Sequence, residues 1–417
     1  INKDAKYSIT ECRKPKKDYP GMTMIHHQLH SVQKFTRSCV ECHRSSATYG
    51  MGSVNYRLAR HFFYAITNRG LETVAVEKKE LGKSVPVATL ELEDVESFAL
   101  TTDKVHGQSE YGFAAVGGEE IIVIDLKNPA FPTIANQIKL SDVQNLLVSG
   151  NTLVACCGKS GIALFDIKQP KRPKLMKTIS TEDARSADLA WPYLYVADGP
   201  GGLKVLDISD LKTAQVIASL KLTFTPQQGS VVQNKNRDSA TLVKTFFQYG
   251  RLNQTGTGRN FAFQLVLVAD DSNIHMINAT EPTKPFIFRQ LLPPALFRGF
   301  DTYNIAGLDV GTHIDLGSDG GKIPTEENDY VYVGLNFNNN QMDRISMLIV
   351  KITDPVRPEV VGRIQAIQSR GLRDLKIAKI YNAPFLKTVA FLSYQDGITA
   401  IDVTKSTDTE NLTTLFG

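Results

Sequence analysis

The residues of this chain best suited to chemistry are Cys39, Cys42 and His43, which form a C-x-x-C-H pattern. Two thiols separated by two residues can add to the two vinyl groups of one porphyrin. A histidine directly after the second thiol can then turn back to ligate the iron. Residues 39–43 therefore predict a covalently bound c-type haem, with the two cysteines as attachment points and His43 as the proximal ligand.

Three other interpretations of this motif are weaker. A structural zinc site would need two more ligands at a similar spacing, and no second pair of cysteines two to four residues apart is present in the sequence. A redox-active dithiol is expected beside a βαβ pattern, which the surrounding sequence lacks. The third interpretation is a chance match, and the specific spacing favours covalent haem over it.

The rest of the sequence limits the class of protein. The chain has 417 residues, of which 22% are charged and 42% hydrophobic, as in a large globular protein. A net charge of +4 gives no argument for nucleic acid, and no such partner is expected. No run of 18 apolar residues occurs, so no transmembrane segment is expected. A start at Ile1 without an apolar leader fits a mature chain whose signal was removed, or a fragment of a longer precursor.

From about residue 62 onward, a strand-like segment that ends in an Ile-Asp-type pair and leads into a turn recurs along the sequence. The copies are residues 71–78 (LETVAVEK, degenerate), 119–129 (EEIIVIDLKNP), 161–170 (GIALFDIKQP), 202–210 (GLKVLDISD), 273–282 (NIHMINATEP), 345–355 (ISMLIVKITDP) and 397–404 (GITAIDVT). The residue that ends the strand, here called the anchor residue, is Glu77, Asp125, Asp166, Asp207, Asn278, Lys351 and Asp402 in turn. The anchors of the second, third and fourth copies are 41 residues apart.

Each copy belongs to a unit of about four strand-like segments. In one unit these segments are residues 186–189, 193–198, 203–208 and 214–220. Alternation with a period of two, β-branched residues and Gly/Pro punctuation favour strands over helices. Units of this size are typical of propeller blades. The sequence therefore predicts an all-β fold, a seven-bladed β-propeller over residues 61–417, preceded by a short, partly helical haem c-binding segment at residues 1–60.

The copies resemble the LVIVD repeat family of β-propellers, through sequences such as the Ile-Val-Ile-Asp of residues 122–125. The resemblance covers roughly residues 62–417 and implies the fold, whereas propellers carry many unrelated functions. We interpret the recurring Asp as structural, because a carboxylate at the end of a strand can accept backbone N–H groups from the following turn.

Two long intervals between copies predict inserted loops, at residues 224–259 and 311–329. Five acidic residues of the second interval could collect a Ca²⁺ ion, namely Asp315, Asp319, Glu326, Glu327 and Asp329. They lack the spacing of an EF-hand loop, so a solvated acidic loop is the preferred interpretation.

The other cysteines give weaker signals. Cys156 and Cys157 lie in an apolar strand-like run and are expected to point to opposite faces as buried small side chains. A vicinal disulfide or a metal site is the alternative. Cys12 is left over as an odd thiol and could bridge to a partner.

Four of the eight histidines lie close together, at His26, His27, His30 and His43. His26 and His30 are four residues apart and would share one face of a helix, whereas His27 would point elsewhere. One haem uses His43 and at most one distal side chain. At least two upstream histidines therefore either make other hydrogen bonds or ligate haems that this chain does not carry.

Residues 30–46 (HSVQKFTRSCVECHRSS), followed by the Gly-Met-Gly-Ser of residues 50–53, resemble the last haem-binding segment of large multihaem cytochromes c. The resemblance implies bis-histidine ligation, export to the periplasm or the cell exterior, and neighbouring haems on a partner chain or on sequence before Ile1. The distal candidates in order of preference are His30, His27, His26 and His61, with Met22, Met24 and Met51 as thioether alternatives. The chain departs from the family in having a single C-x-x-C-H.

The sequence as a whole predicts an electron-transfer subunit with one covalent haem c. In this interpretation the propeller is the scaffold and docking surface of a multihaem complex. The partners are another multihaem cytochrome chain or a redox protein, in a hetero- or homo-oligomer. One alternative is a haem enzyme, an oxidoreductase with an open iron site or an active site at the propeller channel. Another is a cell-surface binding propeller with an accessory haem.

Overall fold

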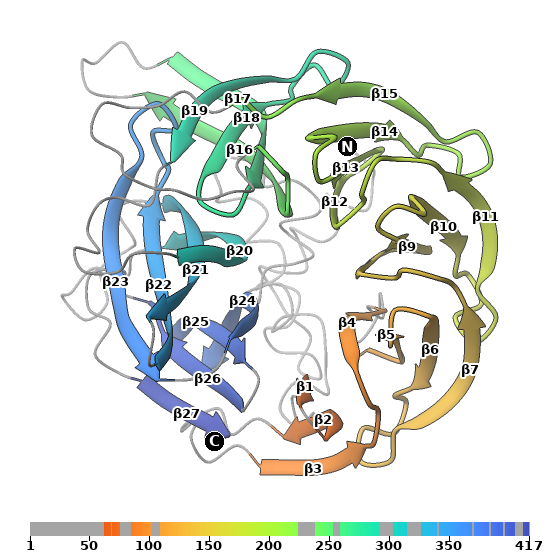
Figure 1. Ribbon diagram of the computed structural model, residues 1–417. Coiled ribbons are helices and arrows are strands. Elements are labelled where there is room, and N and C mark those ends of the chain that lie inside the picture. The colour runs from red at the N-terminus through yellow and green to blue at the C-terminus, as the bar shows by residue number, and fades with distance from the viewer. Residues whose placement is uncertain are drawn as a thin grey trace, which may run out of the picture. The chain divides into compact units, whose positions relative to one another are not determined.

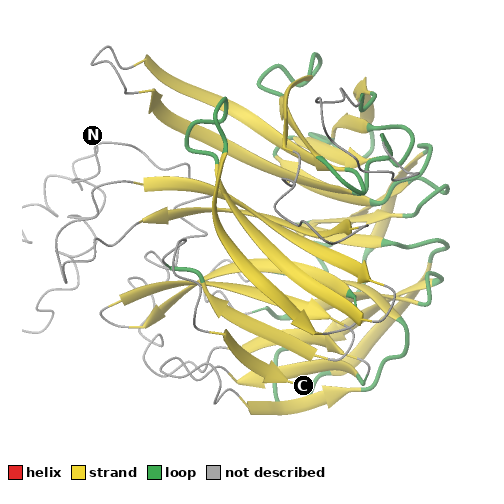
Figure 2. Ribbon diagram, turned by 60° about the vertical axis from the view of Figure 1, so that its left-hand side comes forward, coloured by secondary structure: helices red, strands yellow, loops and turns green. Residues whose placement is uncertain are grey.

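The computed structural model of the chain describes residues 62–67, 69–75, 85–101, 109–223, 238–252, 259–291, 303–314, 327–339, 342–368, 371–382, 385–394, 397–404 and 412–416. The predicted haem-binding segment, residues 1–60, lies outside them, so its helical character and its boundary with the propeller stay predictions. In the described residues all regular elements are strands, and no helix capable of crossing a membrane occurs among them. Figure 2 shows these strands joined by loops.

The described strands form seven sheets in chain order, which we number as blades 1 to 7. Blade 1 consists of β1 (Phe62–Thr67), β2 (Gly70–Ala75) and β3 (Val85–Leu90). Blade 2 consists of β4 (Val95–Leu100), β5 (Tyr111–Val116), β6 (Glu120–Asp125) and β7 (Thr133–Lys139). Blade 3 consists of β8 (Asn145–Ser149), β9 (Thr152–Cys156), β10 (Ile162–Asp166) and β11 (Lys174–Ile179).

The four remaining blades each have four strands. Blade 4 consists of β12 (Ser186–Ala190), β13 (Tyr193–Ala197), β14 (Leu203–Asp207) and β15 (Gln215–Leu220). Blade 5 consists of β16 (Leu242–Leu252), β17 (Arg259–Ala269), β18 (Ile274–Asn278) and β19 (Phe286–Leu291). Blade 6 consists of β20 (Tyr303–Ile314), β21 (Glu327–Asn339), β22 (Met342–Lys351) and β23 (Glu359–Gln368). Blade 7 consists of β24 (Leu372–Asn382), β25 (Phe385–Tyr394), β26 (Gly397–Asp402) and β27 (Leu412–Phe416).

The blades stand around a ring. In each four-stranded blade the first strand lies nearest the centre and the fourth lies on the outside, as β12 and β15 do in blade 4 (Figure 1). The rings of Phe63 in blade 1 and Phe391 in blade 7 have centroids 5.6 Å apart, so the first and last blades also meet. The prediction of an all-β, seven-bladed propeller is confirmed.

Each blade buries both of its faces against neighbouring blades. In β13, Leu194 and Val196 pack in a cluster with blade 3, whereas Tyr195 and Ala197 pack in a cluster with blade 5. Because successive strand residues point to opposite faces, a strand between two blades needs apolar residues at nearly every position. Burial of one such side chain stabilises the fold by about 1.5–3 kcal/mol.

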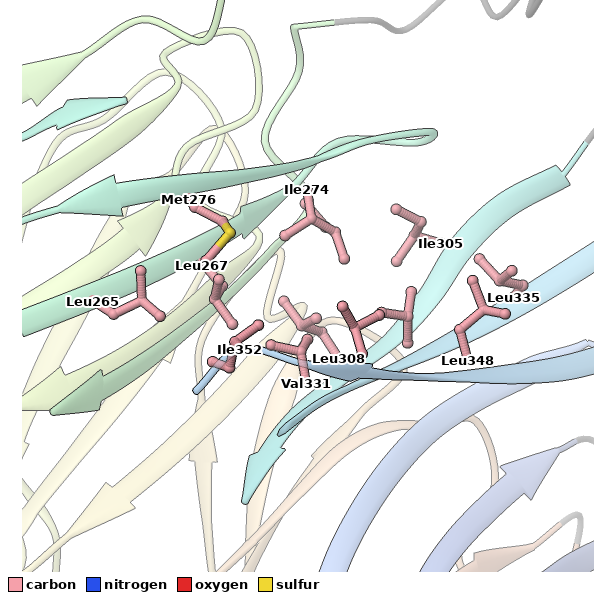
Figure 3. Close-up of a cluster of buried hydrophobic side chains, with 13 residues drawn as sticks. Leu265, Leu267, Ile274, Met276, Ile305, Leu308, Val331, Leu335, Leu348 and Ile352 are labelled. Carbon is pink, nitrogen blue, oxygen red and sulfur yellow. The ribbon is translucent and has the colours of Figure 1, made fainter. Parts of the chain in front are cut away.

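The cluster between blades 5 and 6 shows the same packing in detail (Figure 3). Leu265, Leu267 and Met276 project from blade 5, and Val331 and Leu348 meet them from blade 6. All five side chains are almost fully buried. The repeated apolar runs of the sequence are therefore explained by packing between blades, with no need for a ligand.

The structure of blade 1 corrects one anchor residue that was assigned from the sequence. The pairing of the third with the fourth strand shifts register between Val123 and Ile124 in blade 2, and the equivalent shift in blade 1 falls between Thr73 and Val74. The anchor position that Asp125 occupies is therefore filled in blade 1 by Ala75, not by Glu77. By the same register, β1, β2 and β3 correspond to the second, third and fourth strands of the other blades.

The two predicted inserted loops are partly strand, which corrects their assignment as loops. Strands β16 and β17 stay paired from Leu242 and Ala269 out to Leu252 and Arg259, within the interval 224–259. In the interval 311–329, β20 and β21 pair as far as Ile314 and Glu327. The polar composition of these intervals indicated loops. Strand pairing nevertheless satisfies the backbone N–H and C=O groups there, whatever the side chains are.

The glycine directly before the third strand of blade 4 is required for two reasons: there is no room for a β-carbon, and the backbone is left-handed. Gly202 has φ +76°, and a β-carbon there would collide with the backbone carbonyl of Leu220. Gly150, in the hairpin between β8 and β9, has φ +57° but has open space around it. The two positions therefore separate the conformational cost of a side chain from its steric cost.

We predict that Gly202→Ala lowers the free energy of unfolding by about 3 kcal/mol, because strain and overpacking add together. The control Gly150→Ala should cost about 1 kcal/mol, from the left-handed conformation alone. Chemical denaturation followed by circular dichroism measures both. Equal costs would show that the carbonyl of Leu220 does not restrict this position.

Candidate functional site

The sequence-predicted haem ligands are not among the residues that the structure describes. These are Cys39, Cys42, His43, His30, His27 and His26, and the weaker candidate His61 also lies outside the described ranges. Their roles stay predictions. In the described ranges, no group of three or more His, Cys, Asp or Glu side chains is arranged to hold a metal ion.

Five of the seven anchor residues, the four Asp and the Asn, accept hydrogen bonds from the turns that follow them. The backbone N–H groups of Lys127, Lys168, Ser209, Thr280 and Thr404 donate to Oδ1 of Asp125, Asp166, Asp207, Asn278 and Asp402, over 2.9–3.1 Å. The N–H and hydroxyl of Ser209 lower the pKa of Asp207, so this carboxylate is ionised at neutral pH. The structural interpretation of the recurring Asp is confirmed.

Cys156 and Cys157 point to opposite faces of blade 3, as predicted. Cys156 packs in the cluster with blade 4 and Cys157 in the cluster with blade 2. Both are buried free thiols, so the vicinal disulfide is ruled out. Burial raises the pKa of Cys156, and it raises the pKa of Cys157 to about 11. Both side chains therefore stay protonated and unreactive at neutral pH.

Of the acidic residues considered for Ca²⁺, Asp315, Asp319 and Glu326 fall outside the described residues. Asp329 lies in strand β21 rather than in a loop. Its carboxylate accepts a hydrogen bond of 3.4 Å from Nε2 of Gln248 in blade 5, and its backbone N–H donates to Oγ1 of Thr353. The preferred interpretation of a solvated loop is thus wrong for Asp329, which is almost buried.

Charged side chains gather on the inner strands of blades 4 to 7. We call them the inner-strand cluster, and its members are Asp188 on β12, Lys244 on β16, Asp309 on β20, and Asp374 and Lys376 on β24. Sequence analysis did not single them out, because they lie on the first strand of each blade and outside the repeated third-strand copies. In β12 and β20 the available signal was a single Asp in a strand without other charged residues, whereas β24 is charged at several positions.

The cluster joins neighbouring blades through carboxylates that accept backbone hydrogen bonds. The N–H of Thr245 donates to Oδ2 of Asp188 over 2.7 Å, and its hydroxyl donates to the same atom over 3.1 Å. The N–H of Ile377 likewise donates to Oδ2 of Asp309 over 2.7 Å. These bonds connect blade 4 to blade 5 and blade 6 to blade 7.

A related contact occurs between blades 2 and 3. There the N–H of Leu146 donates to Oγ of Ser97 over 3.0 Å. A polar side chain on one inner strand thus holds the backbone of the next inner strand at three places in the described ring. Such a hydrogen bond satisfies a backbone group that no strand pairing reaches.

The lysines of the cluster lie beside carboxylates. Nζ of Lys244 lies 3.7 Å from Oδ1 of Asp309, and Nζ of Lys376 lies 3.5 Å from Oδ1 of Asp374. The negative charge of Asp374, with smaller effects of Asp309 and Asp188, raises the pKa of Lys376, whose side chain is exposed. A lysine that acts as a nucleophile needs a lowered pKa. The cluster is therefore a set of fixed charges rather than an acid–base centre.

A second polar group, also missed by the sequence analysis, is buried in blade 5. Nε2 of His275 lies 3.0 Å from Oδ2 of Asp270, and both side chains are fully buried. Oδ1 of Asp270 accepts the N–H groups of Ser272 and Asn273, each over 2.7 Å. Burial raises the pKa of Asp270, but the hydrogen bonds from His275 and the two amides outweigh it and lower the pKa. The group fixes the turn between β17 and β18.

Comparison with known proteins identifies one repeat. Residues 183–216 match the family model described as LVIVD repeat, and they span β12 to β14 and the start of β15. The chain therefore contains an LVIVD repeat. The search of curated proteins gave no match.

Two solved structures illustrate what the chain is similar to. The crystal structure of Sqt1 from Saccharomyces cerevisiae is 11% identical, with 77% of this chain and 85% of that chain covered and a TM-score of 0.44. The computationally designed protein Ika4 is 12% identical, with 40% of this chain and 90% of that chain covered and a TM-score of 0.27.

We predict that Asp309→Ala lowers the free energy of unfolding by about 2 kcal/mol, because the N–H of Ile377 loses its acceptor and Lys244 loses its counter-charge. Asp309→Asn keeps an acceptor oxygen and should cost less. The control Asp374→Ala, at a side chain that is 55% exposed, should cost about 0.5 kcal/mol or less. Denaturant titrations measure all three, and equal costs at Asp309 and Asp374 would contradict the link between blades.

Proposed function

We propose that the chain is an electron-transfer c-type cytochrome subunit, with haem c bound through residues 39–43 and the propeller as its scaffold and docking surface. The observation that carries the proposal is the C-x-x-C-H sequence beside three upstream histidines. Two thiols and an adjacent imidazole are the donor set that this cofactor requires. When bound, the haem would supply one-electron oxidation and reduction.

The polar and thiol groups of the described propeller support its role as a scaffold. Its buried thiols at Cys156 and Cys157 are protonated at neutral pH. Lys376 is held as a cation, and the anchor carboxylates are occupied by backbone hydrogen bonds. The two thiols and Lys376 have raised pKa values, whereas a thiol or an amine that acts as a nucleophile needs a lowered one. Their arrangement serves the rigidity of the ring.

Each residue has one role in this proposal. Cys39 and Cys42 attach the porphyrin, and His43 is the proximal ligand of the iron. His30 is the preferred distal ligand, and His27 and His26 serve haems carried by another chain of the complex. Such attachment requires export, so the proposed location is the periplasm or the cell exterior.

We predict that Cys39→Ala or Cys42→Ala disrupts haem attachment and leaves the propeller folded, because no described blade contains these residues. Intact-protein mass after export in a host that matures c-type cytochromes measures attachment, and thermal unfolding measures the propeller. The matched control Cys156→Ala should keep the haem mass. An unmodified mass for the original sequence would reject the proposed function.

A second prediction concerns the iron. Ligation by His43 and a second histidine leaves no open position, so the haem should be low-spin in both oxidation states and bind carbon monoxide slowly or not at all. Optical spectra before and after carbon monoxide addition measure this. Rapid carbon monoxide binding would contradict bis-histidine ligation and would favour a haem enzyme instead.

A further inference from the structure

The turn between the third and fourth strands has the same backbone form in blades 2 to 6. We call these turns the outer turns. In each, the N–H of the fourth residue donates to the C=O of the first over 2.8–3.2 Å, in residues 128–131, 169–172, 210–213, 281–284 and 354–357. Because the backbone is shared, the side chains of different blades can be compared position by position.

The outer turns of blades 4, 5 and 6 each begin with an acidic residue, Asp210, Glu281 and Asp354. In blade 5 this residue pairs with the lysine of the same turn, since Oε1 of Glu281 lies 2.8 Å from Nζ of Lys284. Blades 2 and 3 have neutral residues there, Asn128 and Gln169. The two basic residues of the blade 3 turn, Lys171 and Arg172, therefore have no acidic partner within that turn, and in blade 2 a lysine, Lys127, directly precedes the turn.

The sequence around the outer turn of blade 3 is strongly basic. Residues 168–177 read KQPKRPKLMK, with five basic residues and no acidic one. Lys168 and Lys171 are 74% and 55% exposed, and Arg172 is also exposed. A sequence this basic at a fixed turn is an electrostatic docking feature rather than part of the core.

The outer turns of blades 2 and 3 are joined into one surface. Nδ2 of Asn136 on β7 donates to the backbone C=O of Lys171 over 3.0 Å, and Nζ of Lys171 lies 3.0 Å from Oδ2 of Asp125. The ammonium groups of Lys127 and Lys171 lie 5.5 and 5.9 Å from the ring centroid of the same residue, Tyr111. Cations from two blades therefore stand side by side.

Two apolar side chains accompany these cations. Phe131, in the outer turn of blade 2, is 72% exposed. Leu175 on β11 is 50% exposed and pairs directly with Phe165, which packs against blade 2, so Leu175 lies on the side of blade 3 that faces blade 2. Large apolar side chains exposed among cations are typical of protein interfaces.

We propose that Lys127, Phe131, Lys168, Lys171, Arg172 and Leu175, the blade 2–3 patch, bind an acidic segment of a partner protein that also carries apolar side chains. Four cations face three carboxylates, those of Asp125, Asp166 and Glu110, and this excess leaves positive charge for the partner. Arginine and aromatic residues are the usual anchors of such interfaces. The inference goes beyond electron transfer and does not depend on haem attachment.

A nucleic acid fits this patch less well than a protein. Tight nucleic-acid binders contact about 6–10 phosphates, and the three carboxylates among the cations would repel closely spaced phosphates. The net charge of the whole chain is only +4. A protein segment can instead alternate carboxylates with side chains that cover Phe131 and Leu175.

The test uses the full chain and a fluorescein-labelled peptide of alternating Glu and Leu, followed by fluorescence anisotropy at low and high salt. Arg172→Glu should weaken binding about tenfold at low salt, and Phe131→Ala should weaken it about threefold at both salt concentrations. Two matched controls, Lys284→Glu in the outer turn of blade 5 and Val356→Ala in that of blade 6, should leave binding unchanged. Thermal unfolding checks that all four variants are folded.

Three further probes decide the class of partner. An all-Glu peptide should bind more weakly than the Glu–Leu peptide, because it cannot cover the apolar side chains. Single-stranded DNA and vesicles of phosphatidylcholine with phosphatidylserine should also bind more weakly. The proposal is overturned if the Glu–Leu peptide does not bind, if the controls weaken binding as much as Arg172→Glu, or if DNA or vesicles bind more tightly. None of these readouts requires haem, so failure here leaves the proposed function standing.

Discussion

The structure depends on one constraint, which is that every blade must be covered on both faces by its neighbours. Blade 4 shows it directly, since Leu194 packs toward blade 3 and Tyr195 toward blade 5. No single sheet of this kind could remain in water with two apolar faces, so the blades are stable only as a ring. The contact of Phe63 with Phe391 joins the first blade to the last and completes that cover.

The same constraint decides where charge can be placed. Faces between blades are mainly apolar, so most charged groups lie at the inner strands and at the turns, with Glu72 and His275 as buried exceptions. On the inner strands they are paired and hydrogen-bonded, as Asp309 is with Lys244 and Ile377. At the outer turns of blades 2 and 3 the cations exceed the carboxylates nearby. The charges on the inner strands therefore stabilise the ring, whereas the outer turns of blades 2 and 3 have an excess of positive charge that the proposed partner would contact.

Much of the fold could be predicted because strand periodicity and turn chemistry are local. The segments 186–189 and 203–208 anticipated β12 and β14, and the Asp-capped turns and the opposite directions of Cys156 and Cys157 follow from two-residue alternation. The features that could not be predicted depend on strand register or on contacts between residues far apart in the sequence. Ala75 rather than Glu77 occupies the anchor position of blade 1, because strand pairing and not residue type defines that position. Asp188 and Asp309 act on residues of another blade, which no sequence window contains. The haem ligands, predicted from one motif, lie beyond the described residues.

The shared backbone of the outer turns has a consequence for how this surface can change over time. The shared hydrogen bond uses only main-chain atoms, and in blades 2, 4 and 6 the side chain of the first residue accepts a second one from the third residue. The exposed positions after the first can therefore accept new side chains without a new fold. Neighbouring copies within one gene can then diverge independently. One turn can acquire affinity for a ligand while the equivalent turns of other blades do not bind it. A modular rim of this kind could also accept transplanted turn sequences, one blade at a time.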